Sequence, residues 1–409
     1  MDKVCQLFME AVAAALKNET VSWDDSVTSI QWAQVLSLAE THRMLPMIYQ
    51  ATYRCPGAQA ADPRLLARYK MIAIQMVAIQ AQKTAEFLPL LRELKEAGVE
   101  PMVVKGILCR RLYPNPDHRM SSDEDVLILP EQFPACHQVL TRYGLTTADP
   151  ETDAYEIPYS RPGGVLYLEI HRSLFPDGQK AYGDLNRFFR TVRDRAVEID
   201  GVPTMAPTDH MLYLLCHAFK HFLHSGFGIR QVCDLILFAN RFGHKIDWLE
   251  VLDRCRQIRA EQFAAGLFRI GWKYLGFSLE HSRFPIQWQA IYVDEEPLLL
   301  DILLSGIYGG ATMSRQHSST LTLEAVAAQR QGKKSSGGVR KSLFPPAKDL
   351  EGRYPYLKAK PFLLPVAWTA RILHYRKETA GSRSNAPGES LRIGSERIDL
   401  LKKYGVLDK

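Results

Sequence analysis

The sequence has few cysteines, and none of them is spaced as a metal ligand or redox pair. Its 409 residues contain 7 cysteines without a Cys-x-x-Cys pair, and most lie inside apolar runs, where a thiol behaves as a small hydrophobic side chain. A disulfide scaffold needs more cysteines at regular spacings, and a zinc ribbon needs close pairs. The sequence therefore argues against both classes of protein.

Long hydrophobic runs are also absent. The longest apolar stretches, near 361–373 and 297–308, are too short to cross a bilayer of roughly 30 Å. Asp2 and Glu10 interrupt the apolar stretch at the N-terminus, which lacks the pattern of a signal peptide. The formal net charge of +6 is a mild excess for this length. We expect a soluble cytoplasmic protein with reduced cysteines and no transmembrane segment.

Three common catalytic motifs are missing. The chain has no Gly-x-x-x-x-Gly-Lys-Ser/Thr phosphate loop, no Gly-x-Ser-x-Gly nucleophile turn and no His-Glu-x-x-His zinc motif. Three histidines, His217, His221 and His224, do share one face of a predicted helix. Because no glutamate or cysteine accompanies them at ligand spacing, we expect them to make structural hydrogen bonds or to line an acceptor cleft, with metal ligation as the alternative.

Hydrophobic periodicity divides the chain into four parts. These are an N-terminal helical region (1–99), a mixed core (100–204), a second helical region that completes a cleft (205–310), and a C-terminal extension of helices and loops (311–409). In the first part, Asp62 and Pro63 are typical of a helix start and Gly98 of a helix end, so a helix is predicted between them. It would have about 34 residues if uninterrupted, and a single break is the alternative.

The mixed core alternates short β-favouring runs with helical segments. The runs are PMVV, DVLIL, AYEIPYS and GVLYLEI, between residues 101 and 170. This alternation predicts an α+β protein whose α/β core holds a small mixed sheet flanked by helical regions. Further along, the stretch 329–353 is rich in Gly, Ser, Pro and Lys, and we expect a loop there because it has too little apolar surface to bury.

Three acidic residues lie in or beside these predicted strands. Asp123 and Asp125 are two residues apart at the head of an apolar run, so in a strand they project from the same face. Glu169 lies among apolar strand residues further along. Buried carboxylates need a cation, and a divalent metal such as Mg²⁺ would satisfy all three. The alternative is that all three face solvent.

A series of short motifs runs through the same region. Lys105-Gly106, Tyr113-Pro114 and Arg119 precede Asp123-Glu124-Asp125, LEIHRSL follows, and the helical part beyond contains His217, Lys220, His221, Arg230 and Asp234. In this order and spacing, roughly residues 30–260 resemble an uncharacterised nucleotidyltransferase family of the polymerase-beta-like superfamily. The chain departs from that pattern at Glu124, where an apolar residue is usual and the side chain would project to the opposite, normally buried face of the strand. The site would survive this departure if Glu124 lay at the solvated start of its strand.

The resemblance implies metal-dependent transfer of a nucleoside monophosphate from an NTP to a hydroxyl acceptor, which could be a protein, an RNA end or a small molecule. It implies Mg²⁺ or Mn²⁺ as cofactor, held by the catalytic residues Asp123, Asp125 and Glu169. The implied nucleotide-binding residues are Lys105, Gly106, Arg119 and Ser122. Gly106 opens a predicted helix, so its N-terminal N–H groups would face the triphosphate.

Two other functions stay open. The chain could be a non-catalytic nucleotide-binding or scaffold protein that retains the fold, which the unusual Glu124 favours and the three acidic residues disfavour. It could also bind nucleic acid through the basic stretch 333–341, but that stretch has no aromatic residues on which bases would stack.

Overall fold

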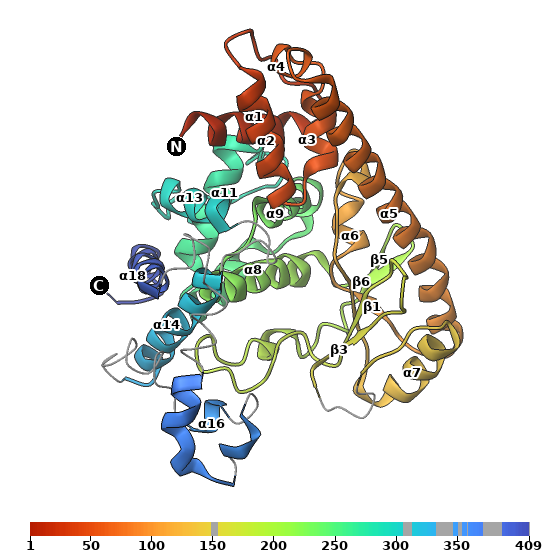
Figure 1. Cartoon of the computed structure of the whole chain (residues 1–409). Coiled ribbons are helices and arrows are strands. Elements are labelled where there is room, and N and C mark those ends of the chain that lie inside the picture. The colour runs from red at the N-terminus through yellow and green to blue at the C-terminus, as the bar shows by residue number, and fades with distance from the viewer. Residues whose placement is uncertain are drawn as a thin grey trace.

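The computed structural model describes residues 1–148, 154–305, 313–332, 347–350, 354–357, 359–370 and 387–408. Helices dominate, and one small mixed sheet lies beside the long helix at one edge of the molecule (Figure 1). The predicted α+β class, with a small sheet flanked by helical regions, is confirmed. None of the helices in the described ranges is both long and apolar enough to cross a membrane.

The N-terminal helices pack against one another, and the third of them also packs against the long helix. They are α1 (Lys3–Leu16), α2 (Ser29–Thr41), α3 (Leu45–Thr52) and α4 (Pro56–Gln59). The long helix α5 (Pro63–Glu96) has 34 residues, and its N-cap Asp62 accepts a hydrogen bond from the Arg64 N–H. It runs from these helices to the far end of the sheet (Figure 1). The helix predicted between Asp62 and Gly98 is therefore confirmed, without a break.

The sheet contains the four predicted strands in the spatial order β1, β2, β4, β3. Their bounds are β1 Met102–Val103, β2 Glu124–Leu127, β3 Glu156–Tyr159 and β4 Leu168–His171. The two central strands run parallel, and their register sets Asp125 opposite Glu169. The outer strands pair antiparallel to them. Short helices α6 (Ile107–Arg110) and α7 (Phe133–Arg142) complete this core with the C-terminal half of α5.

A second, two-stranded sheet was not among the predicted strands. It consists of β5 (Val197–Ile199) and β6 (Val202–Thr204), joined by Asp200 and Gly201. Both turn residues have positive φ, 51° and 80°, which matches the type I′ turn that a two-residue hairpin favours. The Asp-Gly pair is the sequence signal that identifies this hairpin.

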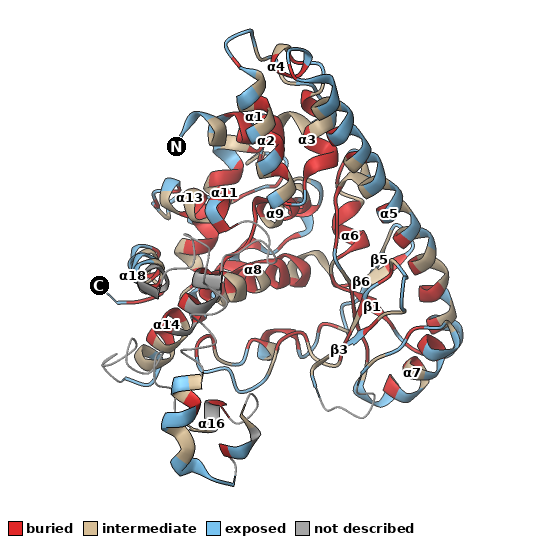
Figure 2. Ribbon diagram, in the orientation of Figure 1, coloured by how far each residue is buried: buried red, intermediate tan, exposed pale blue. Residues whose placement is uncertain are grey.

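Helices make up the rest of the described chain. Their bounds are α8 Pro207–Leu223, α9 Ile229–Phe242, α10 Trp248–Gln257, α11 Glu261–Tyr274, α12 Ile286–Gln289, α13 Glu296–Ser305, α14 Met313–Arg330, α16 Ala347–Leu350 and α18 Pro387–Lys403. Helices α8 and α9 are largely buried, and α5 exposes much of its outer face (Figure 2). The boundaries at 99, 204 and 310 stay a prediction. The expected loop at 329–353 and the basic stretch 333–341 lie mostly or wholly outside the described residues.

Glu124 does not lie at a solvated strand start, which was the condition for the site to survive this departure from the family pattern. Its side chain is fully buried, at 0% exposure, and forms an ion pair with the buried guanidinium of Arg110. It also accepts a hydrogen bond from the Ile107 N–H at 2.9 Å. Gly106 makes room for it: φ there is +59°, and a Cβ would lie 2.0 Å from Glu124 Oε2. Glu124 is thus a buried anion that joins β2 to the start of α6, on the face away from Asp125.

Replacing this buried glutamate tests its role in stability. We expect Glu124→Leu to lower the free energy of unfolding by about 3–5 kcal/mol, because Arg110 is left as an uncompensated buried charge. Adding Arg110→Met should recover most of the loss. Urea denaturation of both variants measures the effect, with the exposed Glu96→Leu as control. A loss of less than about 1 kcal/mol for Glu124→Leu would mean that the pair is dispensable.

Candidate active site

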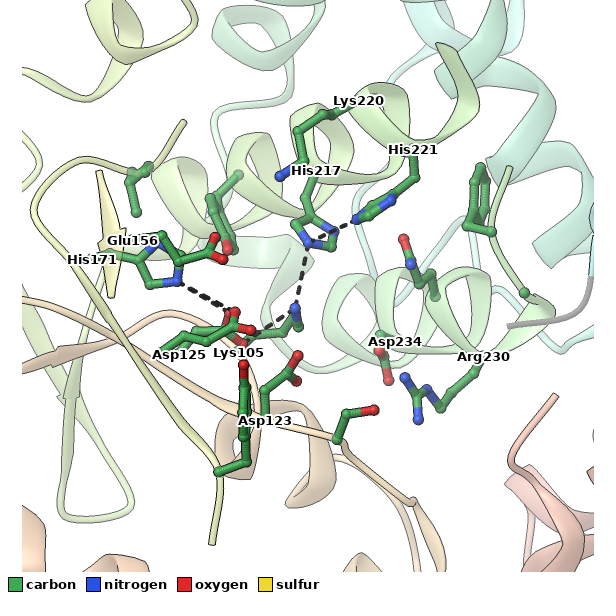
Figure 3. A pocket seen from close by; sticks show the side chains of 18 of the residues that line it. Lys105, Asp123, Asp125, Glu156, His171, His217, Lys220, His221, Arg230 and Asp234 are labelled. Atoms are coloured by element: carbon green, nitrogen blue, oxygen red, sulfur yellow. Dashed lines mark hydrogen bonds and ion pairs between the residues drawn. The ribbon is translucent and has the colours of Figure 1, made fainter. Parts of the chain in front are cut away.

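A polar cavity of about 350 Å³ opens between the sheet and the helices α8 and α9. The sheet contributes the carboxylates, α8 contributes two histidines and a lysine, and the start of α9 contributes Arg230 and Asp234 (Figure 3). The predicted site residues Lys105, Arg119, Ser122, Asp123, Asp125 and Glu169 all line it. Gly106, the remaining one, is not among the lining residues.

Two carboxylates and an imidazole form the centre of the sheet side. Single ligand atoms of Asp125, Glu169 and His171 all lie within 4.8 Å of one another. The parallel register of β2 and β4 puts the first two side by side, and His171 shares the face of Glu169 because it is two residues further along the strand. Asp123 lines the same cavity just before β2 begins. The predicted convergence of the strand carboxylates is therefore observed.

His171 is a site residue that the sequence analysis missed. Its Nε2 lies 3.3 Å from Asp125 Oδ1 and 3.9 Å from Glu169 Oε2. The i, i+2 argument that paired Asp123 with Asp125 also pairs His171 with Glu169, so the signal was present in the run LEIHRSL.

The charges of this cluster are only partly balanced. Although burial works in the opposite direction, Lys105 and His171 hold the pKa of Asp125 well below its ordinary value. Lys105 Nζ lies 3.2 Å from Asp125 Oδ2. Burial, and then the charges of Asp125 and Asp123, raise the pKa of Glu169 to about 8. In the absence of a cation the cluster therefore keeps a proton on Glu169, and its oxygen and imidazole ligands fit a divalent metal that would replace this proton.

Helix α8 faces this cluster with a neutral pair of histidines. Lys105 Nζ lies 3.4 Å from His217 Nε2, and His217 Nε2 lies 3.3 Å from His221 Nε2. Burial, followed by the positive charges of neighbours that include Lys105, lowers the pKa of both imidazoles well below the ordinary value. Lys220 also lines the cavity, whereas His224 is not among the lining residues. His217 and His221 thus present uncharged rings to the cavity.

The loop before β2 is held in place by buried polar groups of α5. Lys83 donates from Nζ to the backbone oxygens of Ser121 and Ser122 at 2.7 and 2.8 Å. Gln80 Oε1 accepts from the Ser121 N–H at 2.8 Å. Burial lowers the pKa of Lys83 to about 8.

Arg119 and Ser122 both line the cavity, and different partners hold their side chains. Arg119 is buried and donates from Nε and Nη2 to the two oxygens of Asp234 at 2.7 and 2.5 Å. The Tyr113 hydroxyl donates to the same carboxylate at 2.8 Å. Ser122 Oγ accepts a hydrogen bond from Arg43, whose side chain also lines the cavity. The first turn of α6, in contrast, gives its Ile107 N–H to Glu124.

The raised pKa of Glu169 predicts a pH dependence of stability in the metal-free protein. The folded protein holds a proton on Glu169 up to about pH 8, whereas an ordinary glutamate releases it near 4.5. This contribution is fully present below pH 4.5 and is lost as the pH rises through 8. We expect wild-type stability to fall by roughly 1–3 kcal/mol more than that of Glu169→Gln between pH 5 and 9.

Urea denaturation in EDTA at several pH values measures this difference. Glu169→Gln keeps the shape of the side chain and removes the ionisation, so the difference between the two proteins isolates this one group. Parallel pH profiles for the two proteins would show that Glu169 ionises normally in the folded state.

Comparison with known proteins agrees with the motif resemblance. No curated protein and no solved structure matches the chain. A family model described as "Uncharacterised nucleotidyltransferase" matches residues 28–275, which run from the start of α2 to the end of α11 and include every residue of the cavity. The match covers more than half of the chain, so this protein belongs to that uncharacterised nucleotidyltransferase family.

Proposed function

We propose that this protein transfers a nucleoside monophosphate from an NTP to a hydroxyl acceptor in a reaction that depends on a divalent metal. The observation that carries the proposal is the clustering of Asp125, Glu169 and His171 in a buried polar cavity that also contains Asp123. Membership of a nucleotidyltransferase family supports the reaction class. The acceptor is a protein, an RNA end or a small molecule with a free hydroxyl.

The carboxylates Asp123, Asp125 and Glu169 would hold the metal, with His171 as a fourth ligand. Carboxylate oxygens suit Mg²⁺ and Mn²⁺, and the imidazole nitrogen favours Mn²⁺ over Mg²⁺ because it is a softer ligand. The bound metal would supply positive charge to the phosphoryl oxygens and to the attacking oxygen.

The chain's own residues position the reactants. The acceptor oxygen forms a bond to the α-phosphorus, the bond from phosphorus to the bridging oxygen breaks, and pyrophosphate leaves with that electron pair. The hydroxyl proton must leave as well, and Glu169 would accept it in the ionised form that a bound cation favours. Lys105 orients Asp125 through their ion pair. The uncharged His217 and His221 line the acceptor side of the cavity.

One observation favours a non-catalytic nucleotide-binding role instead. Lys105 already compensates the charge of Asp125 inside the protein, so that carboxylate is stable without a metal. Glu169 has no such partner at comparable distance among the described residues, and its raised pKa supports the metal-dependent reaction.

Radiolabel transfer separates the two roles. The protein is incubated with each α-³²P-labelled NTP, Mg²⁺ or Mn²⁺, and cell lysate, and the labelled product is then identified. We expect label from the α-phosphate, no label from γ-³²P-NTP, and no transfer in EDTA. Asp125→Asn should reduce transfer by at least about 100-fold, the scale expected when electrostatic stabilisation of the transition state is lost.

The matched control is Asp253→Asn, an exposed aspartate on α10 outside the cavity. Circular dichroism of both variants checks that they are folded, because Asp125→Asn leaves Lys105 without its ion-pair partner. Transfer at wild-type rate by Asp125→Asn, or no transfer by any combination of nucleotide and acceptor fraction, would leave only the binding role.

A further inference from the structure

The side of the cavity away from the carboxylate cluster contains an excess of positive charge. Arg43, Arg119 and Arg230 line it, and Asp234 is the single carboxylate among them. Arg230 and Asp234 lie together on α9, across the cavity from Asp125 and His171 (Figure 3). Arg43 and Arg230 both hold the loop before β2, through Ser122 Oγ and the Met120 backbone oxygen.

The hydrogen bonds of this cluster leave guanidinium donors unused. Arg119, at 1% exposure, directs two of its nitrogens to Asp234, but its third, Nη1, is buried without a hydrogen-bond partner among the described residues. Arg230 Nε is likewise buried without a hydrogen-bond partner among the described residues. Asp234 already accepts from Arg119 and Tyr113. Buried donors without partners are costly, and both belong to side chains that line the cavity, so an acceptor bound on this side would relieve that cost.

The N-terminus of α9 also favours an anionic ligand with hydrogen-bond acceptors. This helix has 14 residues, and its N-cap Gly228 provides no side-chain hydrogen bond. Gly228, Arg230 and Gln231 line the cavity, so the first turn of the helix opens onto it. The N–H groups and dipole of a helix start favour an anion. Burial, and then the charge of Arg119, also lower the pKa of Arg230 to about 10, which a bound anion would reverse.

The other end of the cavity does not offer these donors. Helix α6 has four residues, and the Ile107 N–H at its start donates to Glu124. Gly106 lies against the Glu124 carboxylate and does not line the cavity. Lys105 is occupied by Asp125. An anionic phosphate chain placed there would meet the buried charge of Glu124.

We propose that the first turn of α9, with Arg230, Arg119 and Arg43, forms a polyphosphate subsite that binds the β- and γ-phosphates of the NTP. This inference rests on the proposed function and replaces the expectation that the triphosphate lies at Gly106. During transfer the electron pair of the broken phosphorus–oxygen bond goes to the pyrophosphate, and the arginines and helix N–H groups stabilise the charge that develops there. The α-phosphate then lies between this subsite and the carboxylate cluster.

Binding of inorganic tripolyphosphate in EDTA tests the subsite without metal or catalysis. Calorimetric titration at low salt should show binding to the full-length wild type. Gln231→Glu places a carboxylate in the first turn of α9, where an acidic residue suits the helix dipole, so the fold is retained. We expect this variant to bind tripolyphosphate at least 10-fold more weakly. Arg43→Gln, at an exposed position, should also weaken binding.

Two control variants match these changes outside the cavity. Gln262→Glu adds the same charge to the first turn of α11, and Arg241→Gln removes an arginine from the far end of α9. Both should bind as wild type. The subsite would be overturned if Gln231→Glu bound tripolyphosphate as tightly as wild type does. It would also be overturned if Gln262→Glu weakened binding by the same factor as Gln231→Glu. Inorganic phosphate binding as tightly as tripolyphosphate would also overturn it, because that result indicates a site for a single phosphate.

The outcomes separate this inference from the proposed function. If tripolyphosphate binds as expected but no NTP is ever turned over, the subsite stands and the transfer reaction fails. If transfer occurs while Gln231→Glu changes neither tripolyphosphate affinity nor the KM for NTP, the reaction stands and the subsite fails.

Discussion

The site depends on one constraint, the parallel pairing of β2 with β4. Because this register sets Asp125 opposite Glu169, two carboxylates share a buried space in which both cannot be charged without compensation. Lys105 forms an ion pair with Asp125 and compensates its charge. Glu169 is left with a raised pKa and with His171 as its neighbour. Because the positive charge of Lys105 compensates Asp125 more than Glu169, a divalent cation bound at the cluster would stabilise the ionised form of Glu169. This is the physical basis of the proposed reaction.

Two further buried charges keep this strand in place and shape the cavity. Glu124 projects from the opposite face of β2 and pairs with Arg110, which joins the strand to the start of α6. Lys83 ties the preceding loop to α5. One of these contacts also uses the first N–H group of α6, which is one reason why we propose the first turn of α9 as the place for the phosphates. The stability of β2 and the proposed orientation of the substrate thus depend on the same buried polar contacts.

Local patterns were enough to predict the main elements of the fold, whereas the family resemblance was needed to single out the carboxylates. Helix α5 has a clear N-cap and a glycine at its end, and the four strands of the main sheet are short β-branched runs. Contacts between distant segments were not predictable in this way. The ion pair of Glu124 was not predicted because its partner Arg110 lies on another element. Asp234 likewise contacts Arg119, which is 115 residues away in the sequence. His171 was missed although its spacing from Glu169 was visible.

A crystal structure with Mn²⁺ and an NTP analogue whose α–β bridging oxygen is replaced by a methylene group tests the account most directly. We predict an anomalous scattering peak within coordination distance of Asp125 and Glu169, at roughly 2–2.5 Å from their oxygens, with the terminal phosphates against Arg230 and the first turn of α9. A peak elsewhere, or a triphosphate that lies at Gly106 and leaves the α9 end empty, would contradict it.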